Sequence, residues 1–227
     1  MTPILHPHLH DLERRARQSL GSSSRTIYEM VARALASRHV RGELFLDIGC
    51  GTGNLFPLVR DRFQRYVGVD AIRYEEFPED AEFTPADLNG VSWPLPDGCA
   101  DSVVAVETIE HLENPRLFVR ELTRLTKPCG CIIVTTPNQL SLLSKMTLLI
   151  KNQFNAFQDG SYPAHLTALL ESDLRRIACE CGWENVAIHY SGSGRMAMTP
   201  SRFPRLLSKA FPRALSDNVL LIGRKAA

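Results

Sequence analysis

Residues 44–55, LFLDIGCGTGNL, combine an apolar run of strand length with a glycine-rich turn. The apolar residues lie within 44–48, and Gly49, Gly51 and Gly53 follow at alternate positions. A strand that leads into such a turn brings the backbone close to a ligand, because glycine has no Cβ and adopts unusual φ/ψ angles. The N–H groups of a turn that opens a helix can also receive a negatively charged group. The stretch therefore predicts a β-strand followed by a ligand-binding turn.

Two residues, Asn54 and Asp47, distinguish this stretch from the dinucleotide-binding fingerprint GxGxxG. That fingerprint needs glycine at position 54, where this chain has Asn54. Asp47, just before the first glycine, would repel a pyrophosphate but suits a ligand that carries an ammonium or sulfonium charge. The combination resembles motif I of the class I S-adenosylmethionine (SAM)-dependent methyltransferases. The resemblance implies that the cofactor is held by Asp47, Gly49, Cys50, Gly51 and Gly53.

A second acid stands at the end of the next predicted strand. The segment YVGVDA ends on Asp70 and Ala71. A carboxylate at this place can accept hydrogen bonds from both ribose hydroxyls of an adenosine, since its two oxygens match two vicinal donors. Nicotinamide enzymes use the same device, so Asp70 indicates an adenosine cofactor without identifying it. The family resemblance implies that Asp70 and Ala71 bind SAM.

Two later segments extend the resemblance. FTPADLNG contains Asp87 and Leu88 where the family binds the adenine, although the same residues also favour a turn. SVVAV, residues 102–106, predicts a buried parallel strand, and Glu107 follows at its carboxyl end, where ligands of open α/β sheets bind. The following VETIEHLENP is similar to ubiquinone-pathway-type and related small-molecule methyltransferases. The resemblance therefore adds Asp87, Leu88 and Glu107 to the expected cofactor site.

The remaining periodic segments complete an α/β pattern. Helical spacing of apolar residues predicts helices at about 25–38 and 172–181, and CIIVTTP predicts a fifth strand at 131–137 after a TKPCG turn. The fold class expected is a Rossmann-like, seven-stranded, mostly parallel sheet with helices on both faces and an antiparallel last strand. A single methyltransferase domain is expected over 1–227, with N-terminal cap helices, a SAM-binding core, a lid insertion and a C-terminal part in residues 1–40, 41–137, 138–166 and 167–227.

Composition narrows the function classes. The chain of 227 residues is 44% hydrophobic and 22% charged, with a formal net charge of +1, so it has no global polyanion-binding signature and no nucleic-acid partner is expected. No apolar run reaches the length of a membrane span, and the start of the sequence is too short in apolar residues for a secretory signal. The six cysteines favour free thiols in a reducing cytoplasm. We expect a cytoplasmic protein, a monomer or homodimer, whose partner is a small-molecule acceptor.

Two insertions lie on the substrate side in this fold class. Residues 138–166 are rich in leucine and phenylalanine, which favours a helical lid that shapes an apolar acceptor pocket; dimer surface or core cover is the alternative. Residues 193–217 contain a segment with one apolar and one basic helical face. Such a segment is compatible with contact to a membrane surface or a phosphorylated lipid. A short helix that covers the sheet edge is the favoured interpretation.

Histidine is the candidate for acid–base chemistry. Methyl transfer from a sulfonium needs the nucleophile and the methyl group in line, and a hydroxyl nucleophile also benefits from a base. His165 stands where the family's small-molecule O-methyltransferases often carry a histidine, so the resemblance implies a catalytic role; helix capping or pocket lining is the alternative. His111 is expected to pack beside the cofactor.

Three other functions are compatible with parts of the pattern. Glu107-x-x-Glu110-His111 with a later histidine resembles the metal-binding set of RNA 2′-O-methyltransferases, but no second histidine follows His165 at HxxH or HxH spacing, so no metal site is predicted. A SAM-binding partner subunit or sensor without catalysis is a second alternative, and a nicotinamide oxidoreductase is a third. The favoured prediction is a SAM-dependent methyltransferase that acts on a small or medium-sized apolar acceptor, at oxygen.

Overall fold

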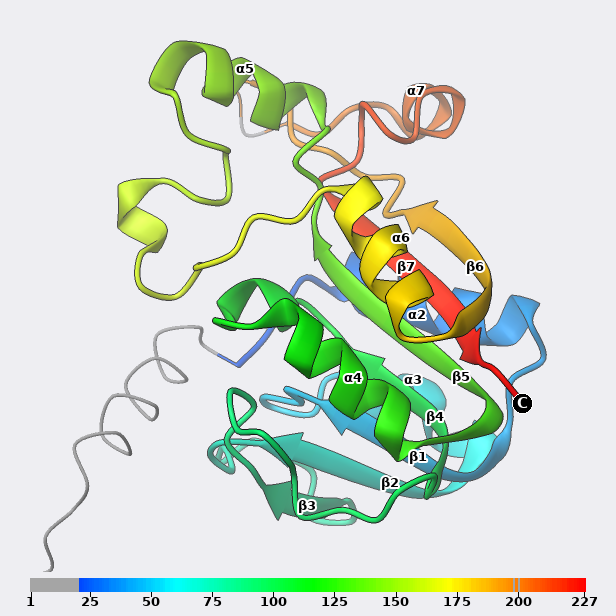
Figure 1. Ribbon diagram of the computed structural model, residues 1–227. Coiled ribbons are helices and arrows are strands. Elements are labelled where there is room, and N and C mark those ends of the chain that lie inside the picture. Colours follow the sequence, from blue (N-terminus) through cyan, green and yellow to red (C-terminus); the bar gives the residue numbers. More distant parts are fainter. Residues whose placement is uncertain (1–20, 198, 200) are drawn as a thin grey trace, which may run out of the picture.

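The computed structural model describes residues 21–197, 199 and 201–227, and a seven-stranded sheet forms its centre (Figure 1). The strand order is β3-β2-β1-β4-β5-β7-β6. Strands β1 to β5 are parallel, whereas β7 runs antiparallel to both of its neighbours. The strands are Gly42–Ile48 (β1), Phe63–Asp70 (β2), Glu82–Pro85 (β3), Ala100–Ala105 (β4), Thr126–Pro137 (β5), Trp183–Tyr190 (β6) and Asn218–Lys225 (β7). The predicted fold class is confirmed.

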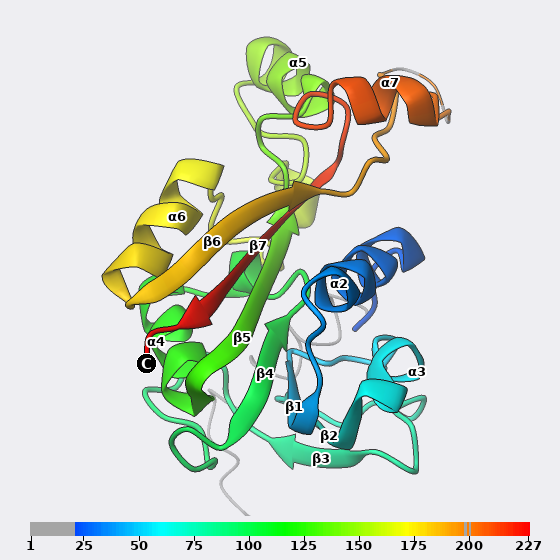
Figure 2. The ribbon, with the colours of Figure 1, turned by 90° about the vertical axis from the view of Figure 1, so that its right-hand side faces the viewer.

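Helices cover both faces of the sheet (Figure 2). On one face lie α2 (Arg25–Ser37) and the short α3 (Phe56–Val59), which continues into the 3-10 turn Arg60–Arg62. Their apolar side chains form one buried cluster with β-strand residues that include Phe45 and Ile133. On the other face lie α4 (Pro115–Leu125) and α6 (Glu171–Glu180), which bury Phe118, Leu122 and Leu174 against the sheet. The helices predicted at about 25–38 and 172–181 are therefore confirmed.

The fifth strand is longer than the sequence predicted. β5 begins at Thr126, and the TKPCG segment joins the strand through an irregularity in its register with β4. Cys129, the fourth residue of TKPCG, has a φ of 61°, which is a left-handed conformation. The expected turn is therefore present as a bulge within the strand and not as a connection before it.

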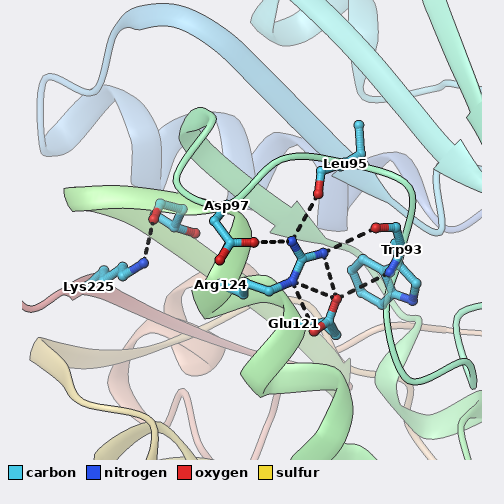
Figure 3. Close-up of polar contacts among 7 residues, drawn as sticks. Trp93, Leu95, Asp97, Glu121, Arg124 and Lys225 are labelled. Atoms are coloured by element: carbon cyan, nitrogen blue, oxygen red, sulfur yellow. Dashed lines mark hydrogen bonds and ion pairs between the residues drawn. The ribbon is translucent and has the colours of Figure 1, made fainter.

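A charged network fixes the connection that enters β4 (Figure 3). Arg124 of α4 donates to both Glu121 oxygens, to the Leu95 carbonyl at 2.9 Å and to Asp97 at 2.6 Å. Trp93 is 2% exposed and packs against Phe118, with 5.5 Å between ring centroids. The planar guanidinium satisfies several acceptors at once, which holds an otherwise irregular segment at the amino end of β4. The network therefore lies at the opposite end of β4 from the site described below.

The two insertions project beyond the carboxyl end of β5 (Figure 1 and Figure 2). The first contains α5 (Leu142–Lys151) and the 3-10 turn Asp159–Ser161, and the second contains α7 (Arg205–Ala210). The Leu142 N–H donates to the Ala214 carbonyl at 2.7 Å, so the two insertions are joined. The prediction that a helix of 193–217 covers the sheet edge is wrong, because α7 lies away from the sheet and its apolar side chains Leu206, Leu207 and Phe211 are exposed.

Within the described part of the chain, no helix has the length and apolarity that crossing a membrane requires.

Candidate functional site

The glycine turn after β1 is closely packed on both sides. Gly49 has a φ of 72° and lies against the side chain of Thr108, with which a Cβ would collide. Gly51 has a φ of 50°, and a Cβ there would overlap the carbonyl of Gly21. Thr52 also donates its N–H to that carbonyl at 2.8 Å. The segment before α2 is therefore laid across the glycine turn, at a distance that only glycine permits.

Asp70 at the end of β2 is fixed by two backbone N–H groups. Gly51 donates to Oδ2 at 2.9 Å, and Ala71 donates to Oδ1 at 2.7 Å. Burial raises the pKa of this carboxyl, whereas the backbone hydrogen bonds lower it. Each carboxylate oxygen has a second lone pair, so both can accept a further hydrogen bond from a vicinal diol.

Asp47 precedes the turn, and neither it nor the turn residues Cys50, Gly51 and Gly53 line the cleft described below. Asp47 is 2% exposed and accepts a hydrogen bond from the hydroxyl of Tyr66. Burial raises the pKa of Asp47 to about 7. Burial also raises the pKa of the Cys50 thiol, which packs in the apolar cluster behind the turn. These predicted residues therefore support the turn from within the fold in this structure.

A cleft of about 380 Å³ opens over the turn and the carboxyl ends of β1, β2 and β4. Of the residues predicted from the sequence, it is lined by Gly49, Asp70, Ala71, Leu88, Glu107 and His165. The N-terminal segment contributes Gly21, Ser22, Ser23 and Tyr28. Asp87 is exposed, and its carboxylate accepts the N–H of Asn89 at 2.9 Å, which is a local turn. Of this segment, Leu88 and Asn89 line the cleft and Asp87 does not.

Two acids follow the end of β4, and of these Glu110 is buried whereas Glu107 is half-buried. Glu107 has a φ of 50° and accepts hydrogen bonds from Thr135 at 2.9 Å and from Asn218 at 2.7 Å. Burial, followed by repulsion from Glu110, raises the pKa of Glu107 well above its usual range. Glu110 accepts from the Thr136 hydroxyl at 3.2 Å, and burial raises its pKa to about 8. Both groups therefore favour the protonated form unless a positive charge lies beside them.

His111 and His165 lie against each other, with 4.8 Å between ring centroids. His111 Nδ1 is 2.7 Å from the Ala164 carbonyl oxygen, and His165 Nδ1 is 2.6 Å from the Ala156 carbonyl oxygen. A carbonyl only accepts hydrogen bonds, so Nδ1 carries the proton in each ring and Nε2 is the unprotonated nitrogen of the neutral form. Burial, followed by the charge of His111, lowers the pKa of His165.

One family pattern covers most of the chain. The sequence pattern of a family described as a methyltransferase domain matches residues 14–188. The chain belongs to the class I SAM-dependent methyltransferases. The cofactor of this family is SAM, as the sequence predicted.

Individual relatives match this methyltransferase in sequence over only part of its length. A probable SAM-dependent methyltransferase of Mycolicibacterium smegmatis is 33% identical over 149 residues, which are 64% of this chain and 55% of that protein. The chain thus spans about half the length of this relative. The 2-methyl-6-phytyl-1,4-hydroquinone methyltransferase of Synechocystis is 30% identical over 105 residues, 43% of this chain and 33% of that protein. Among solved structures, the fold is similar to that of 1,6-didemethyltoxoflavin-N1-methyltransferase from Burkholderia thailandensis, which was crystallised with bound 1,6-didemethyltoxoflavin and S-adenosylhomocysteine. The two superpose with a TM-score of 0.64 at 14% identity, over 100% of this chain and 93% of that one. At this identity the likeness shows the fold alone.

The residues around the first cleft fit SAM. Gly49 lines the cleft beside Asp70, whose carboxylate has lone pairs available for the ribose hydroxyls. Glu107 lies at the end of β4 with a carboxylate that a positively charged group would favour. The acids that line this cleft are therefore of the chemical type that a cationic, ribose-bearing cofactor requires.

A second cleft of about 480 Å³ lies next to the first. Glu107, Ser161 and His165 line both clefts, so these three residues lie between them. The second cleft takes most of its lining from the two insertions, including Ser141, Ser144, Asn155, Arg195 and Arg202. The sequence predicted an apolar acceptor pocket in this place; most residues that line this cleft have polar side chains, although polar and apolar atoms share its surface.

One cluster has the composition of a metal site. Glu110, His111 and His165 place one ligand atom each within 4.8 Å of one another. Carboxylate and imidazole are ligands that suit several divalent ions, and each imidazole is oriented by a carbonyl, as metal-binding histidines commonly are. The sequence argued against a metal because no second histidine follows His165. The fold instead brings His111 to it from the end of β4, which the spacing along the chain does not reveal.

Sequence reasoning missed several residues of the two clefts. Tyr28 and Thr108 were not singled out, although Tyr28 lies in the helix that was expected to cap the cofactor. Ser161 borders both clefts from a connection without a recognisable motif. Asn218 was missed because it lies on β7, far along the chain from the Glu107 carboxylate that it contacts.

Proposed function

We propose that this protein transfers the methyl group of SAM to a hydroxyl oxygen of a small or medium-sized acceptor, with His165 as the general base. The single observation that carries the proposal is that Glu107, Ser161 and His165 line both clefts. A methyl donor in the first cleft and an acceptor in the second would meet at these residues. SAM supplies a methyl group that is already activated by its sulfonium.

His165 has the geometry of a base. Its Nδ1–H is held by the Ala156 carbonyl, which leaves Nε2 as the acceptor, and its lowered pKa keeps the ring neutral at neutral pH. The hydroxyl proton would pass to Nε2 as the oxygen–carbon bond forms and the carbon–sulfur bond breaks. Ser161 anchors the histidine segment, because its carbonyl accepts the His165 N–H at 2.9 Å.

The lining of the second cleft revises the expected acceptor. Its serine, asparagine and arginine side chains suit a polar, hydroxyl-bearing head, so an acceptor that is apolar throughout is not supported. We propose an amphipathic acceptor whose apolar part extends away from this cleft. The Synechocystis relative is named for a hydroquinone that bears a phytyl chain, which is an acceptor of this kind.

The experiment is a transfer assay with SAM labelled in its methyl group and a panel of phenols and hydroquinones that differ in tail length. O-methyl products are expected, and His165→Gln should lower kcat by about a hundredfold or more while the affinity for S-adenosylhomocysteine stays within about twofold. Methylation at nitrogen or carbon would contradict the proposed reaction. Tight S-adenosylhomocysteine binding without transfer to any acceptor or cell extract would favour a non-catalytic SAM-binding protein.

The Glu110, His111 and His165 cluster favours one variant of this function, a metal-assisted O-methylation. In that variant the ion would hold the acceptor oxygen and lower its pKa, and His165 would be a ligand in place of a base. Chelation followed by addition of Mg²⁺, Mn²⁺ or Zn²⁺ separates the two. Activity that survives chelation supports His165 as the base, whereas loss on chelation and recovery with one ion supports the metal.

A further inference from the structure

Exposed apolar side chains are concentrated on the two insertions. Ten large hydrophobic side chains of the described residues are exposed, and eight of them lie on α5 or on α7 and its end. Among these eight, the most exposed are Leu149 (84%), Leu206 (82%), Ile150 (76%) and Phe211 (62%). Scattered apolar residues on a surface are ordinary, but a concentration on two neighbouring helices marks an interaction surface.

Most of the apolar side chains of α5 are exposed in the described fold. Of its ten residues only Ser144 is buried, while Leu142, Met146, Leu148, Leu149 and Ile150 are all exposed. Helices of this length are marginal in water and owe most of their stability to the burial of an apolar face. Because α5 buries a serine instead, its leucine and isoleucine side chains are available to another apolar phase.

The charges of the same segments have a single sign. Leu142–Lys151 and residues 202–213 together carry six basic residues and no acidic residue, although the whole chain has a formal charge of only +1. The basic residues are Lys145, Lys151, Arg202, Arg205, Lys209 and Arg213. All six are exposed. Arg213 lies 3.7 Å from Glu171, Arg202 donates to the Ser193 hydroxyl at 2.8 Å, and Lys151 donates to the Gln158 side-chain oxygen at 2.7 Å.

We propose that these two segments, the docking face, bind the surface of an anionic lipid bilayer. Leucine, isoleucine and phenylalanine side chains would enter the boundary between head groups and acyl chains, and the lysine and arginine side chains would contact the lipid phosphates. A second copy of the chain fits less well, since a symmetric interface on this face would bring two sets of six cations together and neither segment carries an acidic residue.

The position of the docking face connects the bilayer with the second cleft. Ser141 and Ser144 line that cleft from the start of α5, while the exposed side chains of the same helix belong to the docking face. Arg202 lines the cleft from the other insertion. A molecule with an apolar tail in the bilayer would therefore have a short path for its polar head. The proposal of membrane docking itself does not depend on the reaction proposed above.

The test is co-sedimentation of the full chain with lipid vesicles of two compositions. Vesicles of phosphatidylcholine with about one third phosphatidylglycerol should bind the protein, and vesicles of phosphatidylcholine alone should bind it at least about tenfold more weakly. Raising the salt from about 0.1 M to about 0.5 M should weaken binding to the anionic vesicles, because the lipid charges are then screened. Equal binding to both compositions, or no binding to either, would overturn the proposal.

Two sets of variants locate the contact. Leu149→Ser with Ile150→Ser, and separately Leu206→Ser with Phe211→Ser, should each reduce binding to the anionic vesicles by about tenfold or more. Val91→Ser is the matched control, since Val91 is 79% exposed but lies outside the docking face. Lys145→Gln with Lys209→Gln tests the charges of the docking face. Its control is Arg120→Gln with Arg176→Gln, which removes two exposed charges from α4 and α6.

The same variants separate the membrane from a second copy. If analytical ultracentrifugation shows a dimer that Leu149→Ser with Ile150→Ser dissociates, and the parent protein does not bind vesicles, the occupant is another copy and the proposal fails. If the control pairs reduce vesicle binding as much as the pairs on the docking face do, the contact is non-specific and the proposal fails as well.

Discussion

Replacing Asp47 by asparagine should change how the stability of the protein depends on pH. The Asp47 side chain is buried and accepts a hydrogen bond from Tyr66. Burial, together with the charge of Asp70, raises its pKa from 3.8 to about 7, against the opposite effect of the Tyr66 hydroxyl. The folded protein therefore holds the Asp47 proton more tightly than the unfolded chain does.

The two pKa values give the sign and size of the effect. Below about pH 4, Asp47 is protonated in both states, and its contribution to the free energy of unfolding is complete. As the pH rises from 3.8 through about 7, the unfolded chain releases the proton first and that contribution is lost. At about 1.4 kcal/mol for each pKa unit, the loss is of the order of 4 kcal/mol. Asparagine does not ionise and can still accept from Tyr66, so Asp47→Asn should gain up to about 4 kcal/mol over the parent near pH 8 and little near pH 4.

The measurement is urea unfolding of the parent and of Asp47→Asn at a series of pH values. The difference between the two curves isolates Asp47, because other buried acids such as Glu110 are present in both proteins. Asp61→Asn is the matched control, since the Asp61 side chain is exposed and its curve should run parallel to that of the parent. A constant difference between Asp47→Asn and the parent across the whole range would refute the buried, raised-pKa carboxyl on which the prediction rests.

Three further predictions concern the cofactor turn and the base. Asp70→Ala should weaken S-adenosylhomocysteine binding by about tenfold to a hundredfold in calorimetry, because two charge-assisted hydrogen bonds are lost; an unchanged affinity would refute the assignment of the sugar site. Gly51→Ala should lower Tm and weaken the same ligand, since its Cβ would overlap the Gly21 carbonyl at a φ of 50°; Gly160→Ala, with no atom within 4 Å of an added Cβ, is the stability control. The kcat of the parent should fall as the pH drops through the lowered pKa of His165, and His165→Gln should lose this limb of the profile; a limb that persists in the variant assigns it to another group.

The strands could be predicted because a continuous apolar run can be buried in only a few places in a fold. SVVAV is β-branched and uncharged, and the structure buries it as β4 between β1 and β5. The α6 prediction was equally secure: Leu174, Ile177 and Ala178 share one face, and Gly182 follows with a φ of 73°. In each case local pattern and tertiary packing require the same conformation, which is why the sequence alone suffices.

The family motif located the cofactor turn but not the direction of every side chain in it. Neighbouring side chains of a strand point to opposite faces, and small rotations at the strand end decide which one reaches the ligand. Asp47 packs against Tyr66 beneath the turn, whereas Asp70 points toward the turn and the cleft. The placement of Asp47 depends on an aromatic residue of the next strand, and no spacing in the sequence encodes that contact.

The histidine pair could not be predicted, because it depends on the path of the lid insertion. The Glu110 carbonyl accepts the N–H groups of Leu166 and Thr167, at 2.8 and 3.0 Å, which brings the end of that insertion beside β4. His165 then meets His111 as a consequence of this backbone pairing. A residue count between the two histidines carries no information about it, since the insertion has no periodic pattern that fixes its course.

Three acids lie at or beneath the first cleft, and their environment favours a cationic ligand. Asp47, Glu107 and Glu110 all have raised pKa values, and their hydrogen-bond partners are the neutral groups of Tyr66, Thr135, Asn218 and Thr136. Without a positive charge nearby, their ionisation opposes folding at neutral pH. A sulfonium and an ammonium group in the cleft would offset part of that cost through Coulomb attraction in a poorly solvated site. A neutral ligand of the same shape would gain nothing from these carboxyls, so the acids make the cleft selective for charge as well as for shape.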